Sequence, residues 1–352
     1  MESAIIKILL PTILAFVIGI LITPLVTYQL YKYQAWKKTG GKQTLYGTKA
    51  SEFNRLKGDG ETKTPRMGGI VIWGSVAITV LLIALLDRLL PESIFASLDF
   101  FSRSQTWIPL SVFMIGALFG LLNDYYDVTH NKHGVRLKVR LLLITILSGL
   151  IGWWFFDKLE VTTINVPFTD PLLVGWLIIP FFILLTNFIY ASGVIDGIDG
   201  LSGGVFSAIF LSYAGVAFVQ NQFDIAALSA TIAGGTLAFL WFNIPPARFW
   251  MTETGSMALT LSLAVIVFMT DALGDGYGIF LLLIIGLPLI ATVFSNIIQI
   301  GYRRLTDKKF LRIAPLHHHF EAIGWPAYKV TMRYWIISII CACLGIIVAA
   351  VL

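Results

Sequence analysis

Long runs of apolar residues alternate with short polar segments along the whole chain. A membrane-spanning helix needs about 20 predominantly apolar residues, and ten runs come close to that length or exceed it. They cover residues 4–31, 68–90, 104–122, 140–156, 172–192, 201–219, 225–243, 257–271, 277–301 and 331–352. The pattern predicts an all-α, polytopic membrane protein that forms one domain over residues 1–352.

The composition is that of a protein that lies in a lipid bilayer. Of 352 residues, 57% are hydrophobic and 13% are charged, and the mean hydropathy is +0.81. Soluble domains carry about 25% charged residues, so a soluble enzyme is excluded, and we expect the lipid bilayer as a partner and no nucleic acid. Cys341 and Cys343 lie in the last run and are expected to be small apolar side chains.

The basic residues indicate the orientation of the chain. All but four of the 25 Lys and Arg residues fall in the segments that follow the first, third, fifth, seventh and ninth runs; the four exceptions are Lys7, Arg88, Arg103 and Lys158. By the positive-inside rule those five segments are cytoplasmic, and an even number of spans then places both termini outside. On the outer side we expect acidic residues such as Asp271 to be solvated.

Two cytoplasmic segments combine polar side chains with glycine or with basic residues. Lys63 precedes a Pro and a Gly pair, which suits close approach to a phosphate but equally suits a tight turn. Asn123 and Asp124 follow an apolar run, and an acid at that place is costly unless it is paired or binds a metal. Lys138 could neutralise phosphate charge, or it could simply lie at the membrane interface.

Three more segments carry acids, an aromatic side chain and imidazoles. Asp196 and Asp199 are separated by Gly-rich sequence and would share one face if the segment were helical. Glu253 follows Asn243 and Trp250, and an indole can stack on a planar base or lie at the membrane interface. His317, His318 and His319 are consecutive, and their imidazoles supply hydrogen-bond donors, acceptors and partial positive charge near neutral pH.

Together these cytoplasmic segments suggest a single site. Carboxylate and amide oxygens are the ligands that Mg²⁺ prefers, and it often keeps phosphate in its coordination shell. Acids, cations and Gly-rich turns at one membrane depth therefore predict a magnesium–diphosphate site at the cytoplasmic face. A metal-chelating patch is the alternative for the histidines.

The motifs resemble those of the polyprenyl-phosphate N-acetylhexosamine-1-phosphate transferases over nearly the whole chain. Residues 64–69 match the first family motif, residues 196–201 match Asp-Gly-x-Asp-Gly-Leu, and Asn243 and Glu253 have the family's spacing. Residues 314–321, Ala-Pro-Leu-His-His-His-Phe-Glu, are the most specific match and are typical of the muramoyl-pentapeptide branch.

The resemblance implies a reaction and its partners. Phospho-N-acetylmuramoyl-pentapeptide would pass from UDP-N-acetylmuramoyl-pentapeptide to undecaprenyl phosphate, giving lipid I and UMP for peptidoglycan synthesis. The protein would be a homodimer in the bacterial inner (cytoplasmic) membrane and would require Mg²⁺.

The resemblance also implies roles for individual residues. Mg²⁺ would be held by Glu253 with Asp124 or Asp199. The catalytic residues would be Asn123, Asp124, Asp199, Lys138, His317, His318 and His319, and the substrate would be bound by Lys63, Asp196, Asn243 and Trp250.

Several positions depart from the family pattern. Asn123 stands where the family has Asp, and Glu253 also replaces an Asp. Tyr190 and Gly193 stand where the family has Asn, and Lys63 is displaced from the usual basic position. These departures fall on the expected metal shell and nucleotide contacts.

Three alternatives remain open from the sequence. A relative that uses UDP-N-acetylglucosamine is disfavoured by the histidine motif. A low-activity paralogue that binds the donor is suggested by Asn123 and Glu253. A transporter would carry ionisable residues near the bilayer midplane, whereas here the acids lie at one edge of the predicted spans.

Overall fold

The computed structural model describes residues 2–38, 62–90, 92, 95, 98, 100, 104–130, 134–273 and 276–352. In this part of the chain nine helices are long and apolar enough to cross a membrane, and a bent helix pair supplies a tenth span if it is counted as one. The nine are α1 (Glu2–Lys32), α3 (Ile70–Leu89), α5 (Ser104–Thr129), α6 (Leu137–Lys158), α7 (Ile178–Ala191), α8 (Leu201–Val219), α9 (Phe223–Asn243), α10 (Thr252–Ala272) and α14 (Ala327–Val351). The span that contains α7 includes the 3₁₀ turns on both sides of it and runs over Gly175–Ile195. The predicted all-α membrane fold is confirmed.

The fifth predicted span begins differently from the prediction. Leu172 and Leu173 form strand β2 (Leu172–Leu173), which pairs antiparallel with β1 (Thr163–Ile164). A 3₁₀ turn, η1 (Gly175–Leu177), then leads into α7. The apolar run alone could not reveal this because two exposed leucines look the same in a short strand and in a helix.

Helix α10 lies at the centre of the bundle. Every residue from Thr254 to Asp271 is buried, as expected for a helix that is apolar on all sides. Helix α5 packs closely against it. A Cβ on Gly120 would lie 2.0 Å from the carbonyl oxygen of Glu253, and one on Gly116 would lie 2.9 Å from that of Met257. Small residues are the usual means of bringing membrane helices together.

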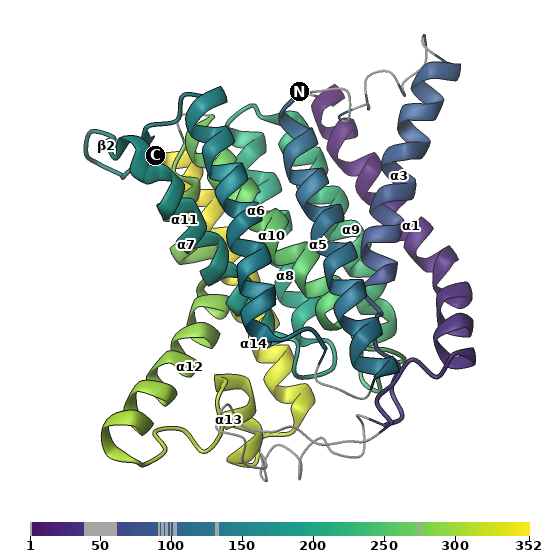
Figure 1. Cartoon of the computed structure of the whole chain (residues 1–352). Coiled ribbons are helices and arrows are strands. Elements are labelled where there is room, and N and C mark those ends of the chain that lie inside the picture. Colours follow the sequence, from purple (N-terminus) through teal and green to yellow (C-terminus); the bar gives the residue numbers. More distant parts are fainter. Residues whose placement is uncertain are drawn as a thin grey trace.

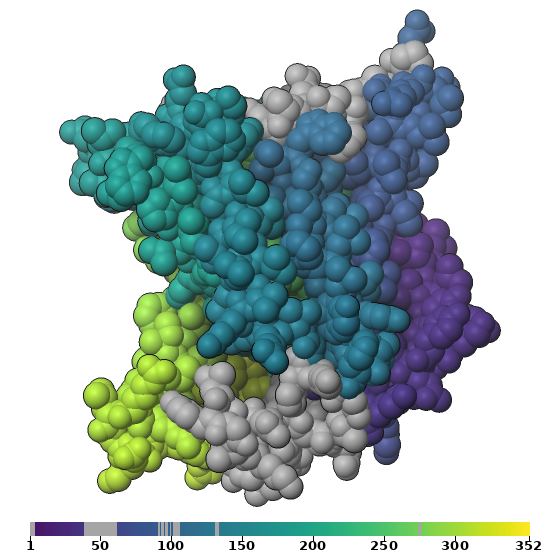
Figure 2. Space-filling model, viewed as in Figure 1, coloured from purple at the N-terminus to yellow at the C-terminus, as the bar shows by residue number. Residues whose placement is uncertain are grey.

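The ninth predicted span is broken into α11 (Gly278–Ile285) and α12 (Leu287–Thr306), which are bent by 75°. Gly286 separates them, and Pro288 lies in the first turn of α12, where its missing N–H costs nothing. Helix α12 therefore leaves the bundle, and Figure 1 shows it standing apart beside α13 (Leu316–Ala322). Figure 2 shows in the space-filling view that this segment protrudes from the rest of the molecule.

The two chain ends lie toward one end of the bundle, and α13 lies at the opposite end (Figure 1). This agrees with an even number of spans. Asp271, near the end of the bundle away from α13, corrects the expectation of a solvated acid because it is only 1% exposed. Its carboxylate accepts the N–H groups of Asn165 and Ile279 at 3.2 and 3.1 Å and so joins three chain segments.

Replacing Gly120 by Val should destabilise the protein strongly, because the added side chain would collide with the backbone of α10. Overpacking of this kind costs about 1–3 kcal/mol or more. The measurement is thermal unfolding in detergent. Gly149→Ala is the matched control, since its Cβ would come no closer than 3.6 Å to Ile183; equal melting temperatures for the two variants would contradict the packing.

Candidate functional site

Thr252 joins three chain segments at the start of α10. Its N–H donates to Asp196 Oδ2 at 2.8 Å, and its hydroxyl lies 2.5 Å from Asp124 Oδ2 and accepts the N–H of Met67 at 3.1 Å. The residue has φ +53°, an uncommon backbone conformation for a β-branched residue. Such strain persists only where the surroundings over-determine it, and here three hydrogen bonds hold it.

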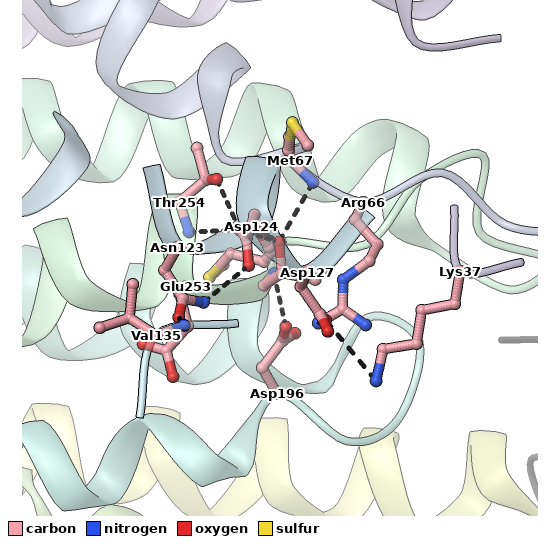
Figure 3. A network of polar contacts seen from close by, with 12 residues as sticks. Lys37, Arg66, Met67, Asn123, Asp124, Asp127, Val135, Asp196, Glu253 and Thr254 are labelled. Atoms are coloured by element: carbon pink, nitrogen blue, oxygen red, sulfur yellow. Dashed lines mark hydrogen bonds and ion pairs between the residues drawn. The ribbon is translucent and has the colours of Figure 1, made fainter. Parts of the chain in front are cut away.

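Asp124 is fully buried and caps α10. Its Oδ2 also accepts the N–H and the hydroxyl of Thr254, at 2.8 and 2.6 Å. A carboxylate at a helix N-terminus satisfies free N–H groups and interacts favourably with the helix dipole. Asn123 lies beside it: its Oδ1 accepts the N–H of Val135 at 2.9 Å, so its Nδ2 faces Asp124 Oδ1, at 3.3 Å (Figure 3).

Asp196 and Asp199 lie in the turn between η2 (Ser192–Ile195) and α8. The sequence predicted that these two acids share one face if the segment is helical. The segment is a turn, so they do not share a helix face. Asp196 Oδ1 accepts the hydroxyl of Ser202 at 2.7 Å. Asp199 accepts the indole N–H of Trp250 on Oδ1 and the N–H of Ala247 on Oδ2, both at 3.1 Å. The two acids therefore tie this turn to the segment that precedes α10.

Asn243 is 1% exposed and binds backbone at both polar atoms. Its Oδ1 accepts the N–H of Gly200 at 2.9 Å, and its Nδ2 donates to the carbonyl of Phe249 at 2.8 Å. Gly200 has φ +76°, which a side chain would strain. Asn243 therefore fixes this turn, and the expected contact with the nucleotide remains a prediction.

Glu253 forms an ion pair that the sequence did not reveal. The Arg140 guanidinium pairs with Oε1, and the Tyr190 hydroxyl lies 3.4 Å from Oε2. Tyr190 was noted only as a departure from the family. Their shared partner explains both residues.

Asp127 forms a second ion-paired cluster beside Asp124. It is 5% exposed and contacts Arg66 at 3.2 Å and Lys37 at 3.5 Å (Figure 3). The sequence-based prediction did not include Asp127. Its spacing could have revealed it, because Asp127 follows Asp124 by three residues and so lies on the same face of α5.

The histidines lie on the short helix α13 instead of in a loop. His317 and His318 are buried, with ring centroids 4.4 Å apart. A Cβ on Gly197 would lie 2.6 Å from His318 Nε2 and 2.7 Å from His317 Nε2. Both imidazoles therefore contact the Asp196–Asp199 turn, although they lie more than 100 residues away in the chain.

The outer contacts of the motif orient α13. His318 Nδ1 lies 2.7 Å from Glu321 Oε2, and His319 Nδ1 accepts the N–H of Arg312 at 3.2 Å. The predicted residues Lys63 and Lys138 are exposed, and the described contacts do not include them in this network.

The acids predicted to hold magnesium, Glu253 with Asp124 or Asp199, do not form a magnesium shell in the arrangement observed, and neither does the neighbouring Asp196. Every carboxylate oxygen of Asp124, Asp196, Asp199 and Glu253 faces a donor from the protein itself. Among the described residues no three His, Cys, Asp or Glu side chains form a group that could hold a metal ion. The magnesium requirement implied by the resemblance thus remains a prediction.

The pKa of Asp196 lies above its ordinary value of 3.8, chiefly because burial penalises the charged form. The hydroxyl of Ser202, the N–H of Thr252 and the Arg66 guanidinium oppose this shift. Ionisation of this carboxyl group therefore costs the folded state stability.

The chain has relatives that define its class. Residues 106–271, from α5 through α10, match the family model of glycosyl transferase family 4. Asp124, Asp196, Asp199 and Glu253 lie within the matched residues, whereas Arg66 and the histidines lie outside them.

The more similar relatives are phospho-N-acetylmuramoyl-pentapeptide-transferases. One from Rickettsia massiliae is 35% identical over 305 residues, 80% of this chain and 79% of the relative. One from Anoxybacillus flavithermus is 30% identical over 338 residues, 95% of each chain, and one from Listeria monocytogenes is 33% identical over 292 residues, 81% of this chain and 84% of the relative. The chain belongs to the phospho-N-acetylmuramoyl-pentapeptide-transferase family.

Replacing Thr252 by Val should destabilise the site, because the Met67 N–H and Asp124 each lose a partner. Unsatisfied buried groups cost about 1–3 kcal/mol. Thr252→Ser keeps the hydroxyl and is the matched control. Unfolding in detergent measures both, and a valine variant as stable as the serine variant would remove the hydroxyl from this role.

Replacing Asp196 by Asn should change how stability depends on pH. Because the folded-state pKa is raised, the wild type loses stability as pH rises from about 3.8 through the folded value. The side-chain amide that Asp196→Asn introduces cannot ionise, and the Ser202 hydroxyl oxygen can accept a hydrogen bond from its NH₂ group. The melting temperature of the variant minus that of the wild type should therefore increase as pH rises through this range.

The control for Asp196→Asn is Asp157→Asn, which removes an exposed charge beside Lys158. Parallel melting curves for wild type and Asp196→Asn across the whole range would contradict the assignment.

Proposed function

We propose that this protein transfers phospho-N-acetylmuramoyl-pentapeptide from its UDP derivative to undecaprenyl phosphate, giving lipid I and UMP. The observation that supports the proposal is the convergence of five separate segments at one end of the bundle. The segments 62–69, 123–130 with 134–140, 190–202, 243–254 and 314–321 meet through the contacts of Thr252, Asp199, Glu253 and Gly197. The donor and acceptor follow from the sequence resemblance and from the group named in the relatives.

The chemistry is a displacement at phosphorus. An oxygen of the lipid phosphate attacks the donor phosphorus that is bonded to the sugar, the bond to the bridging oxygen breaks, and UMP leaves with that oxygen. A phosphate monoester has a second pKa of about 6, so much of the acceptor is already a dianion at pH 7. The step then needs positioning and positive charge more than a strong base.

The described residues can supply both requirements. Arg66, Lys37 and Arg140 provide positive charge, and the paired imidazoles of His317 and His318 lie against the Asp196–Asp199 turn. The Trp250 indole is fixed by its hydrogen bond to Asp199, which would set the plane on which uracil could stack. No step requires a covalent enzyme intermediate.

The membrane setting follows from the same proposal. The acceptor phosphate would enter sideways from the bilayer of the bacterial inner membrane, so its polyprenyl chain stays in hydrocarbon. The site would face the cytoplasm, both termini would face outward, and the protein would act as a homodimer. Transport is disfavoured because Asp124, Asp196 and Glu253 lie near or just beyond the ends of α5, α8 and α10, whereas transporters bind near the midplane.

The purified protein should release UMP when given UDP-N-acetylmuramoyl-pentapeptide and undecaprenyl phosphate. His318→Ala should slow release by about 10²-fold, as expected for the loss of a group that acts on the reacting phosphates. Lys158→Ala, at the end of α6 away from Val135 and the site, is the control and should keep the wild-type rate.

Substrate choice tests the proposal against its nearest rival. UDP-N-acetylglucosamine should give no UMP above background. If UMP were released with this donor and not with UDP-N-acetylmuramoyl-pentapeptide, UDP-N-acetylglucosamine would be the substrate instead. Isolation of a phosphorylated enzyme during turnover would overturn the single displacement.

A further inference from the structure

The charges at the candidate site show an unusual pairing. Glu253 and Tyr190 are both departures from the family pattern, and they are in contact with each other and with Arg140. Oε1 of Glu253 pairs with the guanidinium, and Oε2 faces the phenol. A divalent cation bound at Glu253 would have to share the carboxylate with these two partners, and it would lie next to the fixed positive charge of Arg140.

The neighbouring acids offer no alternative in the arrangement observed. Asp124 Oδ2 faces three donors. Asp124 Oδ1 faces the Nδ2 of Asn123, whose orientation is fixed because its Oδ1 accepts the N–H of Val135. Where the family places a second carboxylate, this chain therefore directs a hydrogen-bond donor toward Asp124.

Two guanidinium groups at this site have donors to spare. The Nε atoms of Arg66 and Arg140 are buried and have no hydrogen-bond partner among the described residues. The explanations for a buried donor of this kind include a catalytic role and a bound water or ion. Arg66 shares Asp127 with Lys37, so this cluster of three carries a net positive charge. Arg66 also acts electrostatically on Asp196 and Glu253, and Figure 3 shows Arg66, Asp127, Asp196 and Glu253 gathered around Asp124.

We propose that Arg66 and Arg140, in place of Mg²⁺, supply the positive charge that binds a nucleoside diphosphate in this chain. A guanidinium presents several N–H groups in a plane that matches phosphate oxygens, and it stays charged at all relevant pH values. This inference rests on the proposed function for its ligand class. It concerns the cation and is separate from whether transfer occurs.

Binding of UDP to the purified protein tests the inference without requiring turnover. Isothermal titration should give the same affinity in EDTA as in excess Mg²⁺. Arg66→Gln and Arg140→Gln should each weaken binding about 10-fold or more, the loss expected for a charge-assisted hydrogen bond. Arg88→Gln, an exposed arginine near the end of α3 away from Gly69 and the site, is the matched control and should bind as the wild type does.

Metal binding is measured separately with Mn²⁺ alone, by its paramagnetic resonance signal. The wild type should show no saturable Mn²⁺ site. Arg140→Gln should gain one because it frees Glu253, and the double variant Arg140→Gln with Glu253→Gln should lose it again. This gain of binding cannot result from a variant that fails to fold.

The outcomes separate the inference from the proposed function. UDP binding that disappears in EDTA, a wild-type Mn²⁺ site that Glu253→Gln removes, or failure of UDP to bind in any condition would each overturn the inference. Metal-independent UDP binding without UMP release would support the inference and would contradict the proposed transfer, leaving a donor-binding paralogue.

Discussion

The structure of this end of the bundle depends on a buried carboxylate at the start of a buried helix. Helix α10 is enclosed on all sides, so its first N–H groups cannot be solvated and must find partners within the protein. Asp196 accepts the N–H of Thr252, and Asp124 accepts the N–H of Thr254 together with the hydroxyls of Thr252 and Thr254. The charge on Asp124 is tolerated because it meets several donors and the positive end of the helix dipole. Thr252 then extends this contact to Asp196 and Met67. The cap of one helix thereby determines how three loops meet.

Much of the fold could be predicted from the sequence because membrane spans are governed by a simple constraint. Backbone polar groups must be paired within the hydrocarbon layer, so long apolar runs become helices. The exceptions have local causes. The 172–173 segment pairs as a strand, and Gly286 with Pro288 breaks the ninth span. An apolar run records neither feature.

The candidate site could be predicted as a set of segments but not as a set of contacts. The acids and histidines were recognisable because charged groups beside apolar runs are expensive. Which donor each acid would meet was not, because Arg140 and Glu253 are 113 residues apart and their pairing depends on how α6 packs near α10. Asn243 illustrates the same limit: its two polar atoms hold the backbone at Gly200 and Phe249.

The way the acids are used also bears on how this family site can change. Asp124, Asp196, Asp199 and Asn243 each hold two or more parts of the frame together, so replacing one would disturb several loops. Glu253 is different because its observed partners are the side chains of Arg140 and Tyr190 and not the backbone of another loop. A change of charge partner at Glu253 therefore leaves the frame intact. Position 253 is where this chain could exchange one kind of cation for another without losing the arrangement of the surrounding loops.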